Sequence, residues 1–300
     1  MILKKLSDLG SIVQREPGKR LVLAAAQDKF SLNAVMNAAN DGVIEPILIG
    51  DKELICTIAK LGGFNMEDVV IIDEPDMEIA VELAVKMANR GEVDILMKGM
   101  VGTSTLLKAV LNKEWGLRTG NLLSHFALFE VETYHKLIAV TDVAMNIAPN
   151  LQEKISIVNN SVACLNKLGI PNPKVAVLGA VEMVNESMAA TLDAALLSKM
   201  NQRDQIRNCI IDGPLAFDNA ISYESAKHKG IRSEVAGDTD LLLMPDIEVG
   251  NVLYKSLVFF AQAKVASVIL GASVPIVLTS RSDSEQAKYD SIILAAAASK

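Results

Sequence analysis

The sequence predicts an α/β protein built from two doubly wound, mostly parallel sheets, one in each of two domains. Short apolar runs alternate with helical patterns along the chain, which is typical of βαβ units. The apolar residues are mostly Ala, Val, Leu and Ile, and aromatic residues make up only 4% of the chain, which suits helices packed on buried parallel strands. A length of 300 residues exceeds the usual size of one core, so we expect a domain boundary near residues 140–150.

The first half of the chain predicts four strands, each followed by a helix. Gly50 ends the second strand, and the glycine pair at 62–63 closes the second helix. Right-handed crossovers would make these strands parallel. The strands are expected at 20–26, 43–49, 69–72 and 94–97, and the helices at 28–41, 51–61, 76–89 and 101–112.

The middle of the chain predicts an antiparallel hairpin, because two apolar runs at 122–130 and 136–140 are separated by only a short segment. The alternation of strands and helices then restarts. Further strands are expected at 174–178, 209–211, 241–244, 267–271 and 276–279, and further helices at 152–168, 188–200, 249–263 and 284–298.

Charge and cysteine content exclude several classes of protein. Lys and Arg total 29 against 36 Asp and Glu, a net charge of −7, and no basic run marks a nucleic-acid partner. Cys56, Cys164 and Cys209 are too few and too widely spaced for a disulfide framework or a metal site, so we expect core residues. With no apolar stretch of ~18 residues and no signal peptide, we expect a cytoplasmic protein that makes no membrane contact.

Polar residues just after the predicted strands are the candidates for a binding site, because ligands of doubly wound sheets bind beyond the carboxyl ends of the strands. The segment after the strand at 94–97 combines glycines with hydroxyls where a helix begins. Free N–H groups there favour an anion, so we expect phosphate or acyl-phosphate binding, with an ordinary helix cap as the alternative. The candidate residues of this segment are Lys98, Gly99, Thr103, Ser104 and Thr105.

Two cations and one histidine follow this segment. Lys108 is expected on the first turns of the helix, and Arg118, between flexible residues, could reach an anion. His125 faces an apolar run, so we expect a core histidine with satisfied hydrogen bonds rather than a catalyst.

Three turns in the second half pair carboxylates or amides with turn residues directly after strands. They begin at 179, 212 and 245. Helix caps and structural turns explain each of them as well as a binding role does. Their candidate ligand-binding residues are Asp212, Gly213, Asp246, Gly250 and Asn251.

The segment at 278–284 carries the strongest functional signal, because it lies between the last strand and the last helix. Ser280, Arg281 and Asp283 place a hydroxyl, a fixed cation and a carboxylate within four residues. Arg can bind a phosphate through two parallel hydrogen bonds, and a nearby carboxylate could take the proton from a thiol. The alternative is a capped helix start, with Ser282 or Asp283 as the cap.

Seven ordered segments together resemble the phosphate acetyl/butyryltransferase family over nearly the whole chain. The resemblance implies two domains of isocitrate-dehydrogenase-like architecture, 1–142 plus 280–300 and 143–279, with the active site in the cleft between them, and usually a homodimer. It also implies that acyl-CoA and phosphate give acyl phosphate and CoA, with coenzyme A as co-substrate and no metal or tightly bound cofactor. We expect butanoyl-CoA, with acetyl-CoA as the alternative. The segments lie at 98–111, 116–124, 190–196, 212–220, 226–231, 245–254 and 274–283.

The resemblance also implies roles for residues near the last strand. In the acetyl-transferring members a Ser-Arg pair binds phosphate, and Ser280 and Arg281 match it. An Asp several residues later is the base for the CoA thiol, but Ala287 stands at about that place here. Asp283 and Asp290 flank it, and we prefer Asp283 because it is nearer the strand end.

A second departure concerns the cation on the helix after the glycine loop. The acetyl-transferring members have Arg there and this chain has Lys108, so either Lys108 or Arg118 supplies the second phosphate cation.

The expected mechanism is direct attack of the CoA thiolate in a ternary complex. A thiol of pKa ~8.5 must first lose its proton, and a carboxylate can accept it. The rival from another class is an NAD- and metal-dependent oxidoreductase of related architecture, with Asp212, Asp246 and Glu248 as metal ligands. The chain lacks a dinucleotide-binding glycine pattern, which argues against it. A CoA-binding regulatory module is the non-enzyme alternative.

Overall fold

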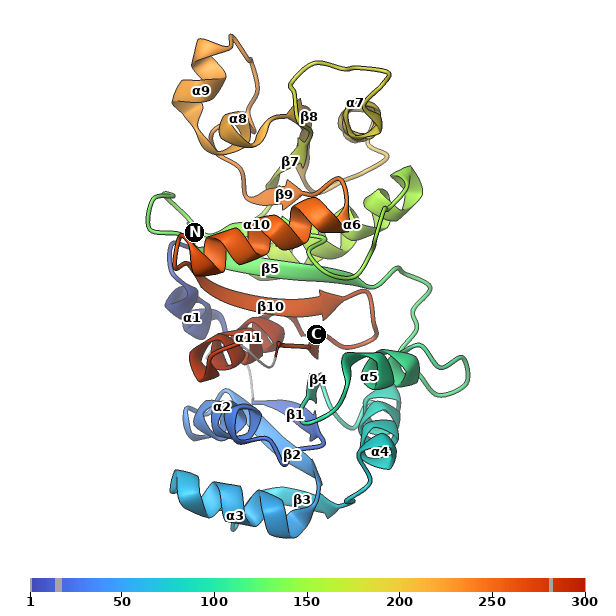
Figure 1. The fold of residues 1–300 in the computed structure, drawn as a ribbon, viewed down its shortest axis with the longest axis vertical. Helices are drawn as coiled ribbons and strands as arrows, with labels where there is room; N and C mark the ends of the chain where they lie inside the picture. The colour runs from blue at the N-terminus through green and yellow to red at the C-terminus, as the bar shows by residue number, and fades with distance from the viewer. Residues whose placement is uncertain (1, 14–17, 281–282, 300) are drawn as a thin grey trace. The chain divides into compact units, whose positions relative to one another are not determined.

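The computed structural model describes residues 2–13, 18–280 and 283–299 (Figure 1). The chain divides into two compact units. Unit 1 comprises residues 1–6 and 122–265, and unit 2 comprises residues 7–121 and 266–300. The predicted domains, 1–142 plus 280–300 and 143–279, have boundaries that differ from those of the two units. The division of the chain into these two domains stays a prediction.

Within the sheet, the strands of unit 2 follow the order β3-β2-β1-β4-β11-β10 and are mostly parallel. Neighbouring strands from β3 to β11 are parallel, whereas β10 and β11 are antiparallel. The strands predicted for this part of the chain are confirmed, with ends that differ by at most three residues. Their bounds are Lys19–Ala24 (β1), Ile44–Gly50 (β2), Val70–Asp73 (β3), Ile95–Lys98 (β4), Lys264–Leu270 (β10) and Ile276–Val277 (β11).

The helices of unit 2 cover both faces of this sheet, and Figure 1 shows α2 and α4 on opposite sides of β1 and β2. Asp28, Asp51 and Asp76 cap the first three long helices by accepting backbone N–H groups, which explains why each helix starts where it does. The helices span Gly10–Val13 (α1), Lys29–Asn40 (α2), Lys52–Gly62 (α3), Met77–Asn89 (α4), Thr103–Val110 (α5) and Glu285–Ala298 (α11), and a 3₁₀ helix spans Leu6–Leu9.

Within the sheet, the strands of unit 1 follow the order β5-β6-β9-β7-β8. The predicted hairpin is confirmed, because β5 and β6 are antiparallel with Ala127 opposite Val140. The other neighbours are parallel. The strands span Ser124–Glu130 (β5), Ile138–Thr141 (β6), Lys174–Leu178 (β7), Ile210–Leu215 (β8) and Leu241–Leu243 (β9), and the longer helices span Leu151–Lys167 (α6), Ala189–Gln202 (α7) and Ile247–Phe259 (α10).

Two features of unit 1 differ from the prediction. Strand β8 continues through Asp212 and Gly213, which were predicted to form the turn after it, because the register against β7 shifts between Ala176 and Leu178 and so accommodates an irregular strand. Two helices, α8 (Phe217–Ile221) and α9 (Tyr223–His228), were not predicted. At five and six residues they are too short to show a helical period.

The strands at the centre of each unit form its core. In β1 and β9 the residues Leu21–Ala24 and Leu241–Leu243 are all buried, as parallel strands covered on both faces must be. Cys164 and Cys209 are core residues as predicted, and burial raises the pKa of Cys164 to about 12. Cys56 is only half-buried, which corrects its prediction, because it lies on the outer side of α3. No helix in the described ranges combines the length and the apolar content that a membrane span requires.

Candidate functional site

The first group of candidate residues lies at one edge of the unit 2 sheet. β1 and β11 both pair in parallel with β4, so that Ala24 lies opposite Lys98 and Val277 opposite Met97. Because neighbouring parallel strands end at the same edge, the segments that follow β4 and β11 lie side by side there. The glycine-hydroxyl segment and the Ser280 segment, predicted separately, are thus brought together.

Gly99 lets the loop after β4 run close against the end of β1. The backbone N–H groups of Gly99 and Met100 donate to the carbonyl oxygens of Ala24 and Ala25 at 2.8 and 2.7 Å. A Cβ on Gly99 would overlap the Ala25 carbonyl oxygen, so only glycine fits without a backbone shift. The buried Lys98 ammonium donates to the carbonyl oxygens of Gly99 and Val101, both at 3.2 Å, and so holds the loop from within.

Helix α5 starts at this edge without a side-chain cap. Its N-cap residue is Gly102, so the first-turn N–H groups receive no side-chain acceptor from that position. The side chains of Thr103 and Ser104 are exposed beside these groups. This arrangement suits an anion. Lys108 was expected on the first turns, but α5 is only eight residues long and Lys108 lies exposed in its last turn, about 8 Å along the axis from Thr103.

Ser280 and Asp283 form a tight turn after β11. The N–H of Ser280 donates to the Asp283 carboxylate at 2.7 Å, and the N–H of Asp283 donates to the Ser280 carbonyl oxygen at 3.2 Å. Ser284 caps α11 by accepting the N–H of Ala287, which corrects the alternative that Asp283 is the cap. The carboxylate of Asp283 is therefore used within the turn itself. Arg281 and Ser282 lie outside the described residues.

A buried cation that the sequence pattern did not predict lies at this turn. Lys288 is 3% exposed, and its ammonium donates to the Thr279 hydroxyl at 2.9 Å and to the Ser280 carbonyl oxygen at 3.0 Å. Burial raises the pKa of Asp283, and the positive charge of Lys288 partly opposes this. Burial lowers the pKa of Lys288, opposed by Asp283 and Asp28. The spacing of Lys288 to the buried Ile292 and Ala295 on α11 was a helical signal that could have predicted its burial.

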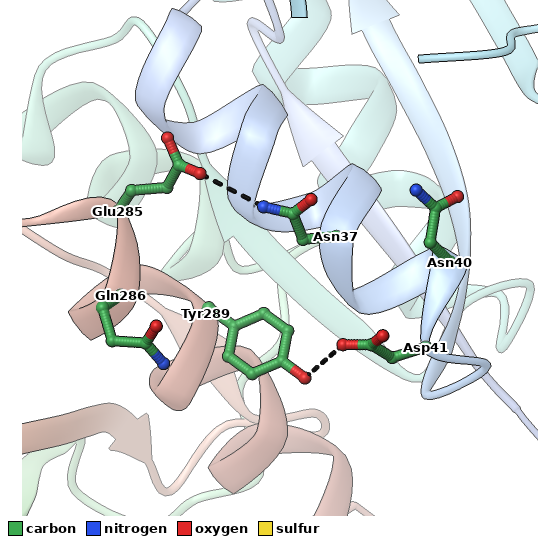
Figure 2. Close-up of a pocket in the computed structure, with 6 residues that line it drawn as sticks. All are labelled: Asn37, Asn40, Asp41, Glu285, Gln286 and Tyr289. Carbon is green, nitrogen blue, oxygen red and sulfur yellow. Dashed lines mark hydrogen bonds between the residues drawn. The ribbon is translucent and has the colours of Figure 1, made fainter. Parts of the chain in front are cut away.

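Helix α11, which carries Lys288, is joined to α2 by side-chain hydrogen bonds. Glu285 accepts hydrogen bonds from the side-chain amides of Asn33 and Asn37 at 3.0 and 3.1 Å, and the Tyr289 hydroxyl donates to Asp41 at 2.6 Å. Figure 2 shows two of these bonds across the open groove between the helices. They hold the first turns of α11, and therefore Lys288, in place relative to α2.

Two other predicted residues of unit 2, Arg118 and Asp290, lie outside the turn that Ser280 and Asp283 form. Arg118 is exposed and forms an isolated antiparallel bridge with Ala272 in the loop after β10. Asp290 accepts a hydrogen bond from the Gln286 amide at 2.9 Å on α11, more than one turn beyond Asp283. Asp283 is thus part of the turn with Ser280, whereas Asp290 lies on α11.

The second group of candidates lies at the carboxyl edge of the unit 1 sheet. Asp246 caps α10 by accepting the N–H of Val249, and Gly250 packs so closely on the Asp142 backbone that a Cβ there would overlap its carbonyl oxygen. The Asn251 amide donates to the carbonyl oxygen of Val143 at 3.4 Å. Gly250 and Asn251 are therefore neighbours of the segment that follows β6, and Asp246 starts the helix that carries them.

Asp142 and His125, side by side at that edge, are both buried. The Asp142 carboxylate accepts N–H groups from Ala144, Met145 and His125 and the amide of Asn146, and burial raises its pKa. His125 is a core residue as predicted, but its Nε2 has no partner among the described residues, so it is not satisfied. Burial lowers the pKa of His125 to about 4. Asp142 follows a strand directly, the signal by which it could have been found.

Asp212 and Gly213 lie apart from this group, on β8 at the far side of the sheet from β6. Asp212 accepts the N–H of Gly213 at 2.8 Å, a local turn contact. The described residues contain no cluster of three or more His, Cys, Asp or Glu side chains placed to hold a metal ion.

Comparison with known proteins gives a consistent set of relatives. A family model described as phosphate acetyl/butaryl transferase matches residues 74–296. Phosphate butyryltransferase of Clostridium acetobutylicum is 48% identical over 98% of both chains. Phosphate acetyltransferase of Thermotoga maritima is 46% identical over 99% of both chains. The crystal structure of a branched-chain phosphotransacylase from Enterococcus faecalis V583 superposes with a TM-score of 0.81 at 34% identity, over 92% of this chain and 97% of that chain.

Proposed function

The chain belongs to the phosphate acetyl/butyryltransferase family, and we propose that it interconverts a short-chain acyl-CoA and phosphate with an acyl phosphate and CoA. We propose butanoyl-CoA as the preferred substrate, because two relatives at 46–48% identity over nearly the whole chain are phosphate butyryltransferases. A relative at 46% identity is a phosphate acetyltransferase, so acetyl-CoA is the second candidate. One methylene changes affinity by only about 1–3 kcal/mol, so neighbouring chain lengths are expected to react as well.

The observation that supports this function best is the edge of the unit 2 sheet. An α5 start without a side-chain cap and the Ser280 turn lie at neighbouring strand ends. The first offers N–H groups and hydroxyls to an anion, and the second offers a hydroxyl and a carboxylate. Arg281 follows Ser280 directly in the sequence and supplies the fixed cation of the proposed phosphate site.

In the proposed reaction Asp283 accepts the proton of the CoA thiol. The thiolate sulfur then forms a bond to the carbonyl carbon of the acyl phosphate, and a tetrahedral oxyanion results. Donors such as Ser280, Thr103 and the α5 N–H groups stabilise this oxyanion, at about 3–4 kcal/mol for a well-placed donor. The bond from carbon to phosphate oxygen breaks, the thioester remains, and phosphate leaves on Arg281. The reverse reaction uses the same groups.

Lys288 is a positioning residue in this scheme. Its ammonium holds the Thr279 hydroxyl and the Ser280 carbonyl oxygen, so it orients the turn that carries Ser280 and Asp283. Its positive charge also favours the ionised form of Asp283, which is the form that can act as a base.

The residues at the unit 1 edge are proposed to contribute to binding of CoA. Asp246, Gly250 and Asn251 follow β9 at the carboxyl edge, where ligands of parallel sheets bind. Asp212 and Gly213 on β8 are proposed for the same role. Lys108 and Arg118 remain the two candidates for a second phosphate cation.

We also propose a cytoplasmic homodimer that uses α10. Of the thirteen residues of this helix only Gly250 is buried, although most of the others are apolar. Val252 is 65% exposed, and Phe259 and Phe260 at its end are 70% and 90% exposed. Apolar patches of this kind mark association surfaces. Val252→Glu should convert a dimer into a monomer in analytical ultracentrifugation, and an unchanged sedimentation coefficient would contradict this.

The function is tested by kcat/KM with phosphate for acyl-CoA substrates from acetyl to hexanoyl. A maximum at butanoyl-CoA is expected, and no thiol release from any of them would refute the proposal. Arg281→Ala should raise the KM for phosphate strongly. Arg281→Lys should leave the KM nearly as high, because a lysine cannot form the two parallel hydrogen bonds of a guanidinium. An unchanged phosphate KM in both variants would remove Arg281 from the site. A change in nicotinamide absorbance with NAD and a divalent metal would instead favour the oxidoreductase.

A further inference from the structure

A second cavity lies wholly within unit 1, between α9 and the loop that follows it. Its volume is ≈ 220 Å³, and its lining includes Tyr223, Lys227, Ile231, Arg232, Ser233 and Ala236. The surrounding sequence is basic, with Lys227, His228, Lys229 and Arg232 inside six residues of a chain whose net charge is −7. The lining of the cavity thus carries two cations, whereas the chain as a whole is negatively charged.

The two cations that line this cavity are not neutralised. Neither the Lys227 ammonium nor the Arg232 guanidinium has a hydrogen bond or ion pair with any residue in the described ranges. Their neighbour Lys229 behaves differently, because its ammonium lies 3.3 Å from Glu182 and 3.5 Å from Asp218. Glu182 and Asp218 thus pair with Lys229, which does not line the cavity, and the two lining cations remain available to an anion.

The loop that presents these groups is held in one conformation. The Ser233 hydroxyl oxygen accepts the N–H groups of Val235 and Ala236 at 3.1 and 3.2 Å. The N–H of Gly237 donates to two carbonyl oxygens of α8, and a Cβ at Gly237 would overlap the Tyr223 backbone. Within the described residues the Ser233 hydroxyl donates to no acceptor, so its proton can serve a ligand.

An aromatic ring completes the cavity. Tyr223 is one of the lining residues and is 72% exposed, so its ring is accessible to a ligand. Two cations and a hydroxyl beside an open ring suit a phosphate attached close to a base, because phosphate binds cations and a purine stacks on an aromatic ring.

We propose that this cavity binds the 3′-phosphorylated adenosine end of coenzyme A, an inference that rests on the proposed acyltransferase function. The 3′-phosphate is a monoester of charge about −2 at pH 7, which matches Lys227 and Arg232. The cavity is smaller than the roughly 300–1,000 Å³ of sites that enclose a whole ligand, which suits one end of a long molecule. Tyr223 then stacks on the adenine, and Ser233 donates to the phosphate.

The test compares CoA with dephospho-CoA, which lacks only the 3′-phosphate, by isothermal titration calorimetry. The full chain should bind CoA more tightly, by about tenfold for each charge-assisted contact. Lys227→Ala and Arg232→Ala should each reduce this preference about tenfold while affinity for dephospho-CoA changes little. Arg203→Ala removes an exposed cation elsewhere in unit 1 and should leave the preference intact.

Two outcomes would overturn the proposal. If the variants keep the full preference for CoA, the cavity does not bind the 3′-phosphate. If they lose affinity for CoA and dephospho-CoA equally, the cations act on another part of CoA or on the fold. Adenosine 3′,5′-bisphosphate should compete with CoA, whereas inorganic phosphate at the same concentration should not, and the reverse result would assign the cavity to free phosphate. Absence of acyl transfer in the unmodified protein would refute the proposed function without affecting these binding ratios.

Discussion

Asp283→Asn tests the proposed base because the structure separates its chemical role from its structural one. The carboxylate accepts the N–H of Ser280 at 2.7 Å, and the amide oxygen of Asn can accept the same bond. The helix cap is Ser284 and is untouched. We therefore expect the free energy of unfolding to change by no more than about 1 kcal/mol, the difference between a charged and a neutral hydrogen-bond acceptor. Loss of a general base should lower kcat by ~10²–10⁴.

The pH profile of the same variant gives the decisive readout. A base acts in its ionised form, so activity of the unmodified enzyme falls as the pH drops through the pKa of Asp283, which burial raises above its ordinary value. That acidic limb should flatten in Asp283→Asn. The assay is thiol consumption with CoA and butanoyl phosphate across pH.

Asp290→Asn is the matched control, because Asp290 lies on α11, the helix that follows Asp283, and contacts Gln286. If Asp290→Asn loses activity while Asp283→Asn keeps it, the assignment between the two is wrong. If both variants stay within about threefold of the unmodified kcat, neither residue is the base.

Three further perturbations test the rest of the structure. Lys288→Met should move the acidic limb of kcat to higher pH, since its charge lowers the pKa of Asp283, whereas removal of the buried Lys154 should leave the limb in place. For His125 the folded pKa of about 4 lies below the unfolded value, so the unfolded state binds more protons and stability falls as the pH drops from 6.5 towards 4. Urea unfolding should show a loss of about 2 kcal/mol between pH 7 and pH 5 that His125→Asn abolishes, and an equal loss in the variant would contradict the assignment. Gly99→Ala should cost about 1–3 kcal/mol because its Cβ overlaps the Ala25 carbonyl oxygen, whereas Gly102→Ala, with its nearest neighbour at 3.7 Å, should cost much less in thermal unfolding.

The sequence alone determined the order and type of the main elements. The strands at 20–26 and 174–178 and the helices at 76–89 and 284–298 match β1, β7, α4 and α11 closely, because apolar periodicity and caps are local properties of the chain. The same reasoning located the Ser280 segment, since residues after parallel strands are placed at one edge whatever the details of packing.

Only the tertiary structure decided which side chains meet and which groups stay without partners. Lys288 is eight residues beyond Ser280 along the sequence, yet α11 turns its ammonium back onto the Ser280 carbonyl oxygen. The unpaired Nε2 of His125 and the lack of partners for the side chains of Lys227 and Arg232 are likewise invisible in a linear pattern. Burial, hydrogen bonding and the pKa of a group depend on neighbours from distant elements, and periodicity reports only on neighbours one or two turns away.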